Sequence, residues 1–446
     1  MSKTLNMTQG KPLGLLVRFA LPLMFGNMFQ QLYMVVDTAV VGRGVGMEAL
    51  AAVGCVDWLN WLMLGVAQGF TQGFSVRVAQ KFGETDREGM GRFMGQSAVA
   101  SGALAVLCTL LGQLALPLFL LLLRVPPELR AMSTLYSRII FAGLPAVYFF
   151  NYCSAMLRAV GDSKTPLIAM TAASVANIVL DLATVFLLQW GIAGAAGATV
   201  IAQILSGCIC FWQIRRNPQL RLTGSLLRPR KDLLVNLLKI GAPAAGKNLM
   251  IALGGILVTT TVNTFGTAFI AGFTASNKLY GLLEIAALSY GYAIITYVGQ
   301  NYGAMRLDRI RAGMKSAWVL AMATSLVIAV LMFLFGRPIT MLFISRENPA
   351  DAALAGDFAY RYLCVMASCL PVLYALYLLL SALQGFGDTV RPMISGFVEL
   401  GARVAVVLAV MFTGWKTGIF GAEIAAWFGA AFYLAHHYRK RMKQTI

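Results

Sequence analysis

A carboxylate and a carboxamide lie four residues apart within an apolar segment of this chain. The segment is SVANIVLDLATVF, residues 174–186, and the two side chains belong to Asn177 and Asp181. On a helix this spacing puts both side chains on one face, one turn apart. A charged group inside a membrane is costly and usually faces a cavity or a partner. The pair is therefore a candidate binding site for an ion, and hydrogen bonding between helices is the alternative.

The composition shows which solvent surrounds the chain. Hydrophobic residues make up 59% of the 446 residues and charged residues only 12%, whereas a soluble domain carries roughly 25% charged residues. The apolar runs are long enough to cross a bilayer and do not alternate, which favours helices over a barrel. The sequence therefore predicts an all-α integral membrane protein.

The net charge of +18 comes from short basic loops between the apolar runs. The clusters around Arg92, Arg215, Arg309 and Arg439 fall in alternate loops, which is the positive-inside pattern. It predicts an even number of spans in the plasma (inner) membrane with both termini cytoplasmic, and it argues against a nucleic-acid partner. The only two histidines lie beside the basic tail, so we expect neither a histidine metal site nor an enzyme.

Twelve apolar spans divide into two sets of six. The predicted spans are 12–40, 47–80, 90–122, 130–157, 165–189, 192–214, 233–262, 267–300, 310–335, 352–383, 391–413 and 417–438. We expect an N-terminal six-helix lobe at 1–215, a cytoplasmic inter-lobe loop at 216–232 and a C-terminal six-helix lobe at 233–446.

The two halves resemble each other in sequence. Residues 143–166 align without gaps to residues 369–392, sharing a Leu-Pro pair and a Gly-Asp followed by Pro. AQKFGE (79–84) likewise matches GQNYGA (299–304). Because each half has an even number of spans, the repeat is parallel. Such pseudo-symmetric folds commonly hold their substrate between the halves and rock one half against the other.

At the level of motifs the chain resembles a known family along essentially its whole length. The motifs are LPLMFGNMFQQLYMVVDTAVVG, GFSVRVAQKFGETD, AMLRAVGDSKTP, VANIVLDL, VGQNYGA and ALQGFGDTVRP. They are similar to those of the multidrug and toxic compound extrusion (MATE) transporters, most closely the prokaryotic DinF-like and MepA-like branch. The resemblance implies a twelve-helix antiporter with two lobes around a central cleft. It would export cationic or amphipathic organic compounds in exchange for Na⁺ or H⁺.

The resemblance also implies a cation site in the first half. The matching positions are Asp37, Asn177, Asp181 and Thr199. Together they offer only hard oxygen ligands, which suit a small cation such as Na⁺. Two carboxylates in a low dielectric can equally hold a proton, so both ions stay open. Pro22 matches a family proline at which the first helix is proposed to bend, and a passive kink is the alternative.

The second half departs from the first at these positions. Val258, Arg403 and Val407 stand where the first half has Asp37, Asn177 and Asp181, so the halves are not two copies of one ion site. Glu399 and Arg403 have the spacing of a structural ion pair on one helix. Glu284 lies in the middle of the eighth span, where Lys247 and Lys278 could neutralise it or where it could face the cleft and attract a cationic substrate.

The substrate cleft is expected to be large and weakly selective, because methionine adapts to varied shapes and aromatic faces attract cations. With Glu284, the candidates for its lining are Gln30, Gln31, Tyr33, Met34, Tyr148, Asn151 and Met156. For each of them, packing within the bundle is the alternative to ligand contact.

Three other functions were weighed against drug export. A flippase or exporter for a lipid-linked or endogenous metabolite would require extra helices or a strongly basic cavity. A membrane enzyme would require a nucleophile with its base, or a metal motif. A channel fits duplicated lobes with asymmetric buried charge less well than alternating access does. The expected partners are small organic molecules and the lipid bilayer, the expected state is a monomer, and no cofactor beyond the coupling ion is expected.

Overall fold

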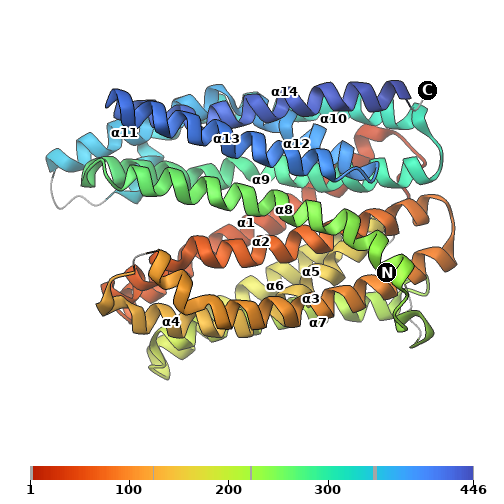
Figure 1. The fold of residues 1–446 in the computed structure, drawn as a ribbon, viewed down its shortest axis with the longest axis horizontal. Coiled ribbons are helices and arrows are strands. Elements are labelled where there is room, and N and C mark those ends of the chain that lie inside the picture. The colour runs from red at the N-terminus through yellow and green to blue at the C-terminus, as the bar shows by residue number, and fades with distance from the viewer. Residues whose placement is uncertain (1–3, 124, 221–223, 345–348, 445–446) are drawn as a thin grey trace.

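The computed structural model describes residues 4–123, 125–220, 224–344 and 349–444, which form an elongated helical bundle (Figure 1). The α-helices of these ranges are α1 (Pro12–Gly44), α2 (Met47–Gly83), α3 (Arg87–Leu122), α4 (Pro127–Ala142), α5 (Leu144–Ala159), α6 (Lys164–Asp181), α7 (Gly191–Arg216), α8 (Lys231–Val262), α9 (Thr267–Gly303), α10 (Leu307–Thr340), α11 (Pro349–Ser368), α12 (Leu370–Gly385), α13 (Val390–Thr413) and α14 (Gly421–Gln444). Short helical elements are η1 (Leu182–Leu187), η2 (Gly224–Leu227), η3 (Met341–Phe343) and η4 (Lys416–Phe420).

The helices have the length and hydropathy of membrane spans. Among the described residues, ten are long and apolar enough to cross a bilayer, and two bent helix pairs raise the number to as many as twelve. Large apolar side chains cover the outside, as at Phe412 and Phe432, which are 87% and 82% exposed. Such a surface is stable only against lipid, so the predicted all-α membrane architecture is confirmed.

The spans predicted at 130–157 and 352–383 are each broken into two helices. α4 and α5 are bent by 43°, and α11 and α12 by 50°. Pro145 and Pro371 stand in the first turn of the second helix of each pair. Proline donates no backbone hydrogen bond and its ring clashes with the carbonyl one turn earlier, so a straight helix is interrupted there. Because both halves carry the Leu-Pro pair, both halves have the helix break at the equivalent position.

Helices from the two halves of the chain occupy different parts of the bundle. We call α1–α7 the N-lobe and α8–α14 the C-lobe. In Figure 1 most of the N-lobe, red to yellow-green, fills the lower part and the C-lobe, green to blue, fills the upper part, while the red start of α1 reaches the C-lobe helices α9 and α10. The N and C labels lie at the same end of the bundle, on the right of the view. We call this end, where α2 and α9 also finish, the terminal end.

Small residues bring α2 and α8 into close contact between the lobes. A Cβ atom added to Gly69 would lie 2.5 Å from Ala245 Cα, and one added to Gly73 would lie 2.7 Å from Gly241 Cα. Small residues allow helix backbones to approach closely within a membrane, where packing replaces the hydrophobic effect as the attractive force. α2 and α8 therefore form much of the seam along which the lobes meet.

Candidate functional site

Asn177 and Asp181 lie on α6, where the α-helix gives way to a π-helix. α6 ends at Asp181, and η1 continues the chain as a π-helix. π-Helical turns are rare and occur frequently at functional sites. Both side chains are fully buried, at 0% exposure. The polar pair predicted from the spacing therefore lies inside the bundle.

Asp37 reaches the same place from α1. Its carboxyl group lies within hydrogen-bonding reach of the carboxyl group of Asp181. Two carboxylates have no proton between them, so this hydrogen bond forms only when one of the two is protonated. If both are ionised, two negative charges share a buried site, which is costly unless a cation lies between them.

Unpartnered polar atoms collect in this place. With both acids ionised, the buried side-chain atoms without a hydrogen-bond partner in the described structure include Asp37 Oδ1, Asn177 Oδ1 and Nδ2, and both carboxylate oxygens of Asp181. Buried polar groups are nearly always hydrogen-bonded. A set of adjacent oxygens without donors fits a small cation or a proton.

Thr199 lies on α7, which packs against α6. Its hydroxyl donates to the Ala195 carbonyl of its own helix at 3.2 Å. This bond uses the hydroxyl proton and leaves the oxygen as an acceptor. The structure thus brings Asp37 and Asp181 together, with Asn177 one turn away, and gives Thr199 a hydrogen bond within its own helix.

Two tyrosines stand beside the carboxylates. Tyr33 of α1 and Tyr136 of α4 both lie within electrostatic range of Asp37 and Asp181. Tyr33 is among the residues proposed from the sequence, whereas Tyr136 was missed. A single tyrosine in an apolar span carries no signal that separates a site residue from a packing residue. Its position follows from the packing of α4 against α2 and α7.

A small polar cavity adjoins Tyr33. Its lining includes Gln30, Tyr33, Ser174 and Gln203, and its volume is about 20 Å³. A cavity of this size holds about one water molecule when polar groups line it. Two of the predicted cleft residues therefore line a water-sized space between α1, α6 and α7.

The other first-half cleft candidates have different surroundings. Tyr148 and Met156 are almost completely buried, at 1% and 0% exposure, and the Tyr148 hydroxyl lies 3.3 Å from Cys108 Sγ. These two side chains are packing residues in this structure. Asn151 donates to the carbonyl of Val147 in its own helix at 2.9 Å.

Two further candidates lie on exposed or inter-lobe surfaces of α1. A Cβ atom on Gly281 of α9 would lie 3.4 Å from Gln31 Nε2, so Gln31 contacts the C-lobe. Met34 is 46% exposed. Pro22 lies inside α1, which continues as one helix on both sides of it.

Glu284 of α9 has an aromatic partner. The Tyr377 hydroxyl of α12 donates to Glu284 Oε1. The ammonium of Lys247 lies 5.7 Å from the centroid of the Tyr377 ring. Glu284 is partly exposed whereas Lys247 is buried. Glu284 is thus partly exposed as a residue, and its carboxylate is held in place by the phenol.

Arg403 has a stronger partner than the one expected from its spacing. Its Nε and Nη2 donate to the two carboxylate oxygens of Glu423 on α14, at 3.0 and 2.8 Å. Glu399, the predicted partner, lies 3.6 Å from Nη2, and its Oε1 has no hydrogen-bond partner in the described structure. The predicted pair is present, but the guanidinium mainly joins α13 to α14.

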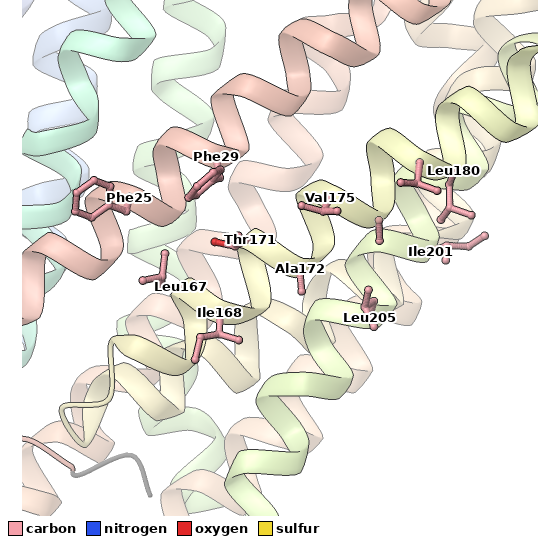
Figure 2. Close-up of a pocket in the computed structure, with 12 residues that line it drawn as sticks. Phe25, Phe29, Leu167, Ile168, Thr171, Ala172, Val175, Leu180, Ile201 and Leu205 are labelled. Atoms are coloured by element: carbon pink, nitrogen blue, oxygen red, sulfur yellow. The ribbon is translucent and has the colours of Figure 1, made fainter.

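An apolar groove of about 1060 Å³ lies between α1, α6 and α7. Figure 2 shows its lining, in which Phe25 and Phe29 come from α1 and the hydroxyl of Thr171 is the one labelled polar group. Ile168 and Val179 are exposed in it. None of Asp37, Asn177 and Asp181 lines this groove. The groove is an open, apolar surface, separate from the carboxylate site.

The sequence matches known proteins along most of the chain. The MatE family model matches residues 22–183 and 243–410, one stretch in each half. The probable multidrug resistance protein YpnP of Bacillus subtilis is 27% identical over 398 residues, which cover 89% of this chain and 88% of that protein. The probable multidrug resistance protein NorM of Thermotoga maritima is 25% identical over 422 residues, covering 92% of this chain and 88% of that protein.

Solved structures share the fold. A MOP superfamily transporter from Pyrococcus furiosus, described as having a binding pocket of reverse polarity, superposes with a TM-score of 0.91 at 23% identity. A multidrug resistance MATE family transporter in an outward-facing conformation superposes with a TM-score of 0.90 at 24% identity. Each comparison covers 100% of this chain and 99% of the other. The twelve-span, two-part helical architecture is therefore a known one.

Proposed function

The chain belongs to the MATE family, whose members are transporters and not enzymes, and from this premise we propose a specific activity. The protein is a secondary active antiporter that exports cationic or amphipathic organic compounds by alternating access. The exchanged ion is Na⁺ or H⁺. The unit is a single chain in the plasma (inner) membrane, with the terminal end in the cytoplasm.

The observation that carries this proposal is the buried pair of carboxyl groups on Asp37 and Asp181. The two acids come from different helices, so the occupancy of the site between them affects how α1 packs on α6. A proton or Na⁺ relieves the charge repulsion and stabilises one packing over the other. This coupling of ion occupancy to helix packing is what an antiporter needs.

The residues present fit either ion. The carboxylates of Asp37 and Asp181, the amide oxygen of Asn177 and the hydroxyl of Thr199 form an all-oxygen donor set, which a hard cation prefers. A proton needs only the two carboxyl groups, which are already within hydrogen-bonding reach. Asn177 and Thr199 therefore become essential for Na⁺ coupling and secondary for H⁺ coupling.

For the exported compound we propose a contact with Glu284 in the C-lobe. The residue is partly exposed, and its carboxylate is oriented by Tyr377. A carboxylate beside an aromatic ring attracts an organic cation through both charge and the ring face. The ion site and the substrate contact then lie in different lobes, so relative movement of the lobes links them.

The test is transport by the purified full-length protein in liposomes. Ethidium, a monovalent organic cation, serves as the probe, and a Na⁺ gradient or a pH gradient is imposed separately. The variant Asp181→Asn is compared with wild type. The matched control is Glu88→Gln, because Glu88 is an exposed acid on α3 that pairs with Arg92 one turn later on the same helix.

We expect one gradient to drive ethidium transport in wild type and Glu88→Gln, and Asp181→Asn to lose the driven component. Equal driven transport by Asp181→Asn, at equal reconstituted amounts, would remove the proposed coupling role. If neither gradient drives wild type, the drug-antiport proposal is wrong, and lipid-linked or endogenous metabolite substrates become the next ones to assay.

A further inference from the structure

The ends of α2 and α9 meet at the terminal end through two glycines. A Cβ atom on Gly83 would collide with the backbone carbonyl of Gln300, and one on Gly303 would collide with that of Gln80. Only glycine lets two backbones approach so closely. In each half the glycine follows its glutamine by three residues, so the two contacts are related by the internal repeat.

The two glutamines extend this contact into the opposite lobe. Gln80 Nε2 donates to the carbonyl of Gly385 on α12 at 3.0 Å, and Gln300 Nε2 donates to the carbonyl of Ala159 on α5 at 2.9 Å. Ala159 and Gly385 are equivalent residues in the gapless alignment of the halves. Each lobe therefore binds the other through an equivalent hydrogen bond from a glutamine amide to a backbone carbonyl. The lobes cannot separate at this end without breaking both.

Two further contacts between the lobes lie near the same end. Thr296 Oγ1 donates to the carbonyl of Arg158 at 3.2 Å, and the Arg158 guanidinium lies 4.5 Å from the Tyr292 ring centroid. Within the described ranges, α2 makes hydrogen bonds to the C-lobe only from Gly65 to its end. The structure is therefore a conformation closed at the terminal end.

Residues 5–10, which we call the strap, lie across this closure. Met7 is fully buried. Its N–H donates to Gln300 Oε1 at 2.9 Å, and its carbonyl accepts from Asn301 Nδ2 at 3.0 Å and from Arg309 Nη2 at 3.1 Å. Arg309 Nη2 also donates to the carbonyl of Gly10 at 2.9 Å. These contacts bind the strap to the C-lobe.

The strap also touches the N-lobe. A Cβ atom on Gly161, which follows α5, would collide with the Leu5 carbonyl. The strap is folded locally, because Asn6 Oδ1 accepts from the Thr8 N–H at 2.9 Å and Gly10 takes a positive φ of 86°. An Asx turn and a left-handed glycine are common ways to turn a chain sharply. The strap is thus a formed structure that straddles the seam.

Gln300 differs from its repeat partner Gln80 in one respect. The side-chain oxygen of Gln80 accepts from Arg77 Nη1 on the same helix at 2.9 Å, whereas that of Gln300 accepts from the strap. Gln300 therefore joins the strap to the bond that holds the lobes together. Gln80 makes the equivalent inter-lobe bond without the strap.

We infer that the strap is a latch which holds the terminal end closed, and that Gln300 is the residue through which it acts. The inference rests on the proposed alternating access. When the strap is in place, it orients the Gln300 amide toward Ala159 and fills the space beside Gly161. When it leaves, the inter-lobe bond loses its support and the lobes open more readily at this end.

The experiment measures lobe separation directly by electron–electron spin distance measurement in full-length protein in nanodiscs. Nitroxide labels are placed at Arg87→Cys and Arg311→Cys, which are exposed residues at the starts of α3 and α10, in a transport-competent background without the native cysteines. Deletion of residues 5–9, Gln300→Ala and Gln80→Ala are measured singly, and each glutamine variant is combined with the deletion. Met7→Asp provides a second way to displace the strap, and a gel-filtration profile like that of wild type confirms folding.

We expect deletion of the strap and Met7→Asp each to raise the population with the longer distance roughly tenfold, the change expected when one or two buried hydrogen bonds are lost. Gln300→Ala should have little further effect once the strap is deleted, whereas Gln80→Ala should keep its full effect. A wild-type distance distribution in both the strap deletion and Met7→Asp would overturn the latch. So would equal effects of Gln300→Ala and Gln80→Ala, both with the strap present and with it deleted. If no variant, Gln80→Ala included, shows a longer distance, alternating access itself fails.

Discussion

Arg403 of α13 and Glu423 of α14 form a two-point ion pair, with hydrogen bonds of 3.0 and 2.8 Å from Nε and Nη2 to the two carboxylate oxygens. Glu399, one turn before Arg403, lies 3.6 Å from the same guanidinium. The arginine is only 4% exposed. The guanidinium therefore fastens one helix to another, and removal of Glu423 would leave a buried cation with a single distant carboxylate.

We expect Glu423→Ala to lower the free energy of unfolding by about 3–5 kcal/mol, the usual cost of removing one partner of a buried pair. Glu399→Ala should cost less, because its geometry is poorer. The triple variant Glu399→Leu, Arg403→Met and Glu423→Met should be closer to wild type than Glu423→Ala, since it removes the buried guanidinium together with both of its carboxylates. Reversible unfolding in mixed micelles measures all four. A larger loss for Glu399→Ala than for Glu423→Ala would contradict this assignment.

Asp37 and Asp181 should act as a unit. If they hold one ion between them, Asp37→Asn and Asp181→Asn each remove the driven component of transport, and the double variant is no worse than either single variant. Residues that act together are strongly non-additive in this sense. The measurement is ethidium transport in liposomes under the effective gradient. Losses that add in the double variant would show two independent sites.

The sequence predicts the carboxylate site in the N-lobe and the buried ion pair in the C-lobe to different degrees. Asn177 and Asp181 stand out because polar groups in an apolar run are costly, and the family resemblance supplies Asp37. The pairing of Arg403 with Glu423 could not be predicted, because the local i,i+4 spacing points to Glu399 and the contact of α13 with α14 is tertiary. Met7 was missed for a similar reason, since a short polar segment before the first span suggests an exposed tail.

The helix breaks show a different limit. The Leu-Pro pair was visible in both halves, but apolar periodicity continues through it, and hydropathy alone does not distinguish a bent span from a straight one. The proline geometry that bends α4 against α5 is a backbone effect. Tyr136 gives no signal at all, because its place beside the two acids depends on how α4 packs against α2 and α7.

Glu284 should affect the affinity for organic cations more than the turnover rate. We expect Glu284→Gln to raise KM for ethidium about tenfold, which corresponds to the loss of one favourable charge contact of about 1.4 kcal/mol. Tyr377→Phe should have a smaller effect in the same direction, because the carboxylate remains but loses its orienting phenol. An uncharged amphipathic substrate is the control, and its KM should not change. A fall in kcat with unchanged KM would place Glu284 outside the substrate contact.

Asp86 gives a pH-dependent contribution to stability outside the membrane spans. The Gly89 N–H donates to its carboxylate at 2.8 Å, and Lys81 Nζ lies 3.0 Å from it. These contacts lower the pKa of Asp86 below its usual range. Because the pKa is lower in the folded state, the contribution is complete above the unfolded value of about 3.9 and is lost as pH falls through the folded value.

Asp86→Ala should therefore cost about 1 kcal/mol at pH 7, the typical value of a helix N-cap. The difference from wild type should shrink as pH is lowered below the unfolded value of about 3.9 and the carboxylate becomes protonated. Asp86→Asn retains an N-cap acceptor and should fall between the two. Thermal unfolding of the three proteins across this pH range tests the prediction. A stability difference between wild type and Asp86→Ala that grows on acidification would contradict it.

Pro22 should be a hinge in α1 rather than a passive kink. Proline in a helix interior costs about 3 kcal/mol, and Pro22→Ala restores an N–H that can donate to the carbonyl one turn earlier. We expect the variant to be more stable to heat and yet to transport ethidium about tenfold more slowly, because a stiffer α1 moves Asp37 less readily. Pro243→Ala in α8 is the matched control, since the C-lobe helix has no carboxylate at the position of Asp37. It should gain stability and keep its transport rate. A wild-type transport rate in Pro22→Ala, with the gain in stability present, would make the proline a structural feature without a role in coupling.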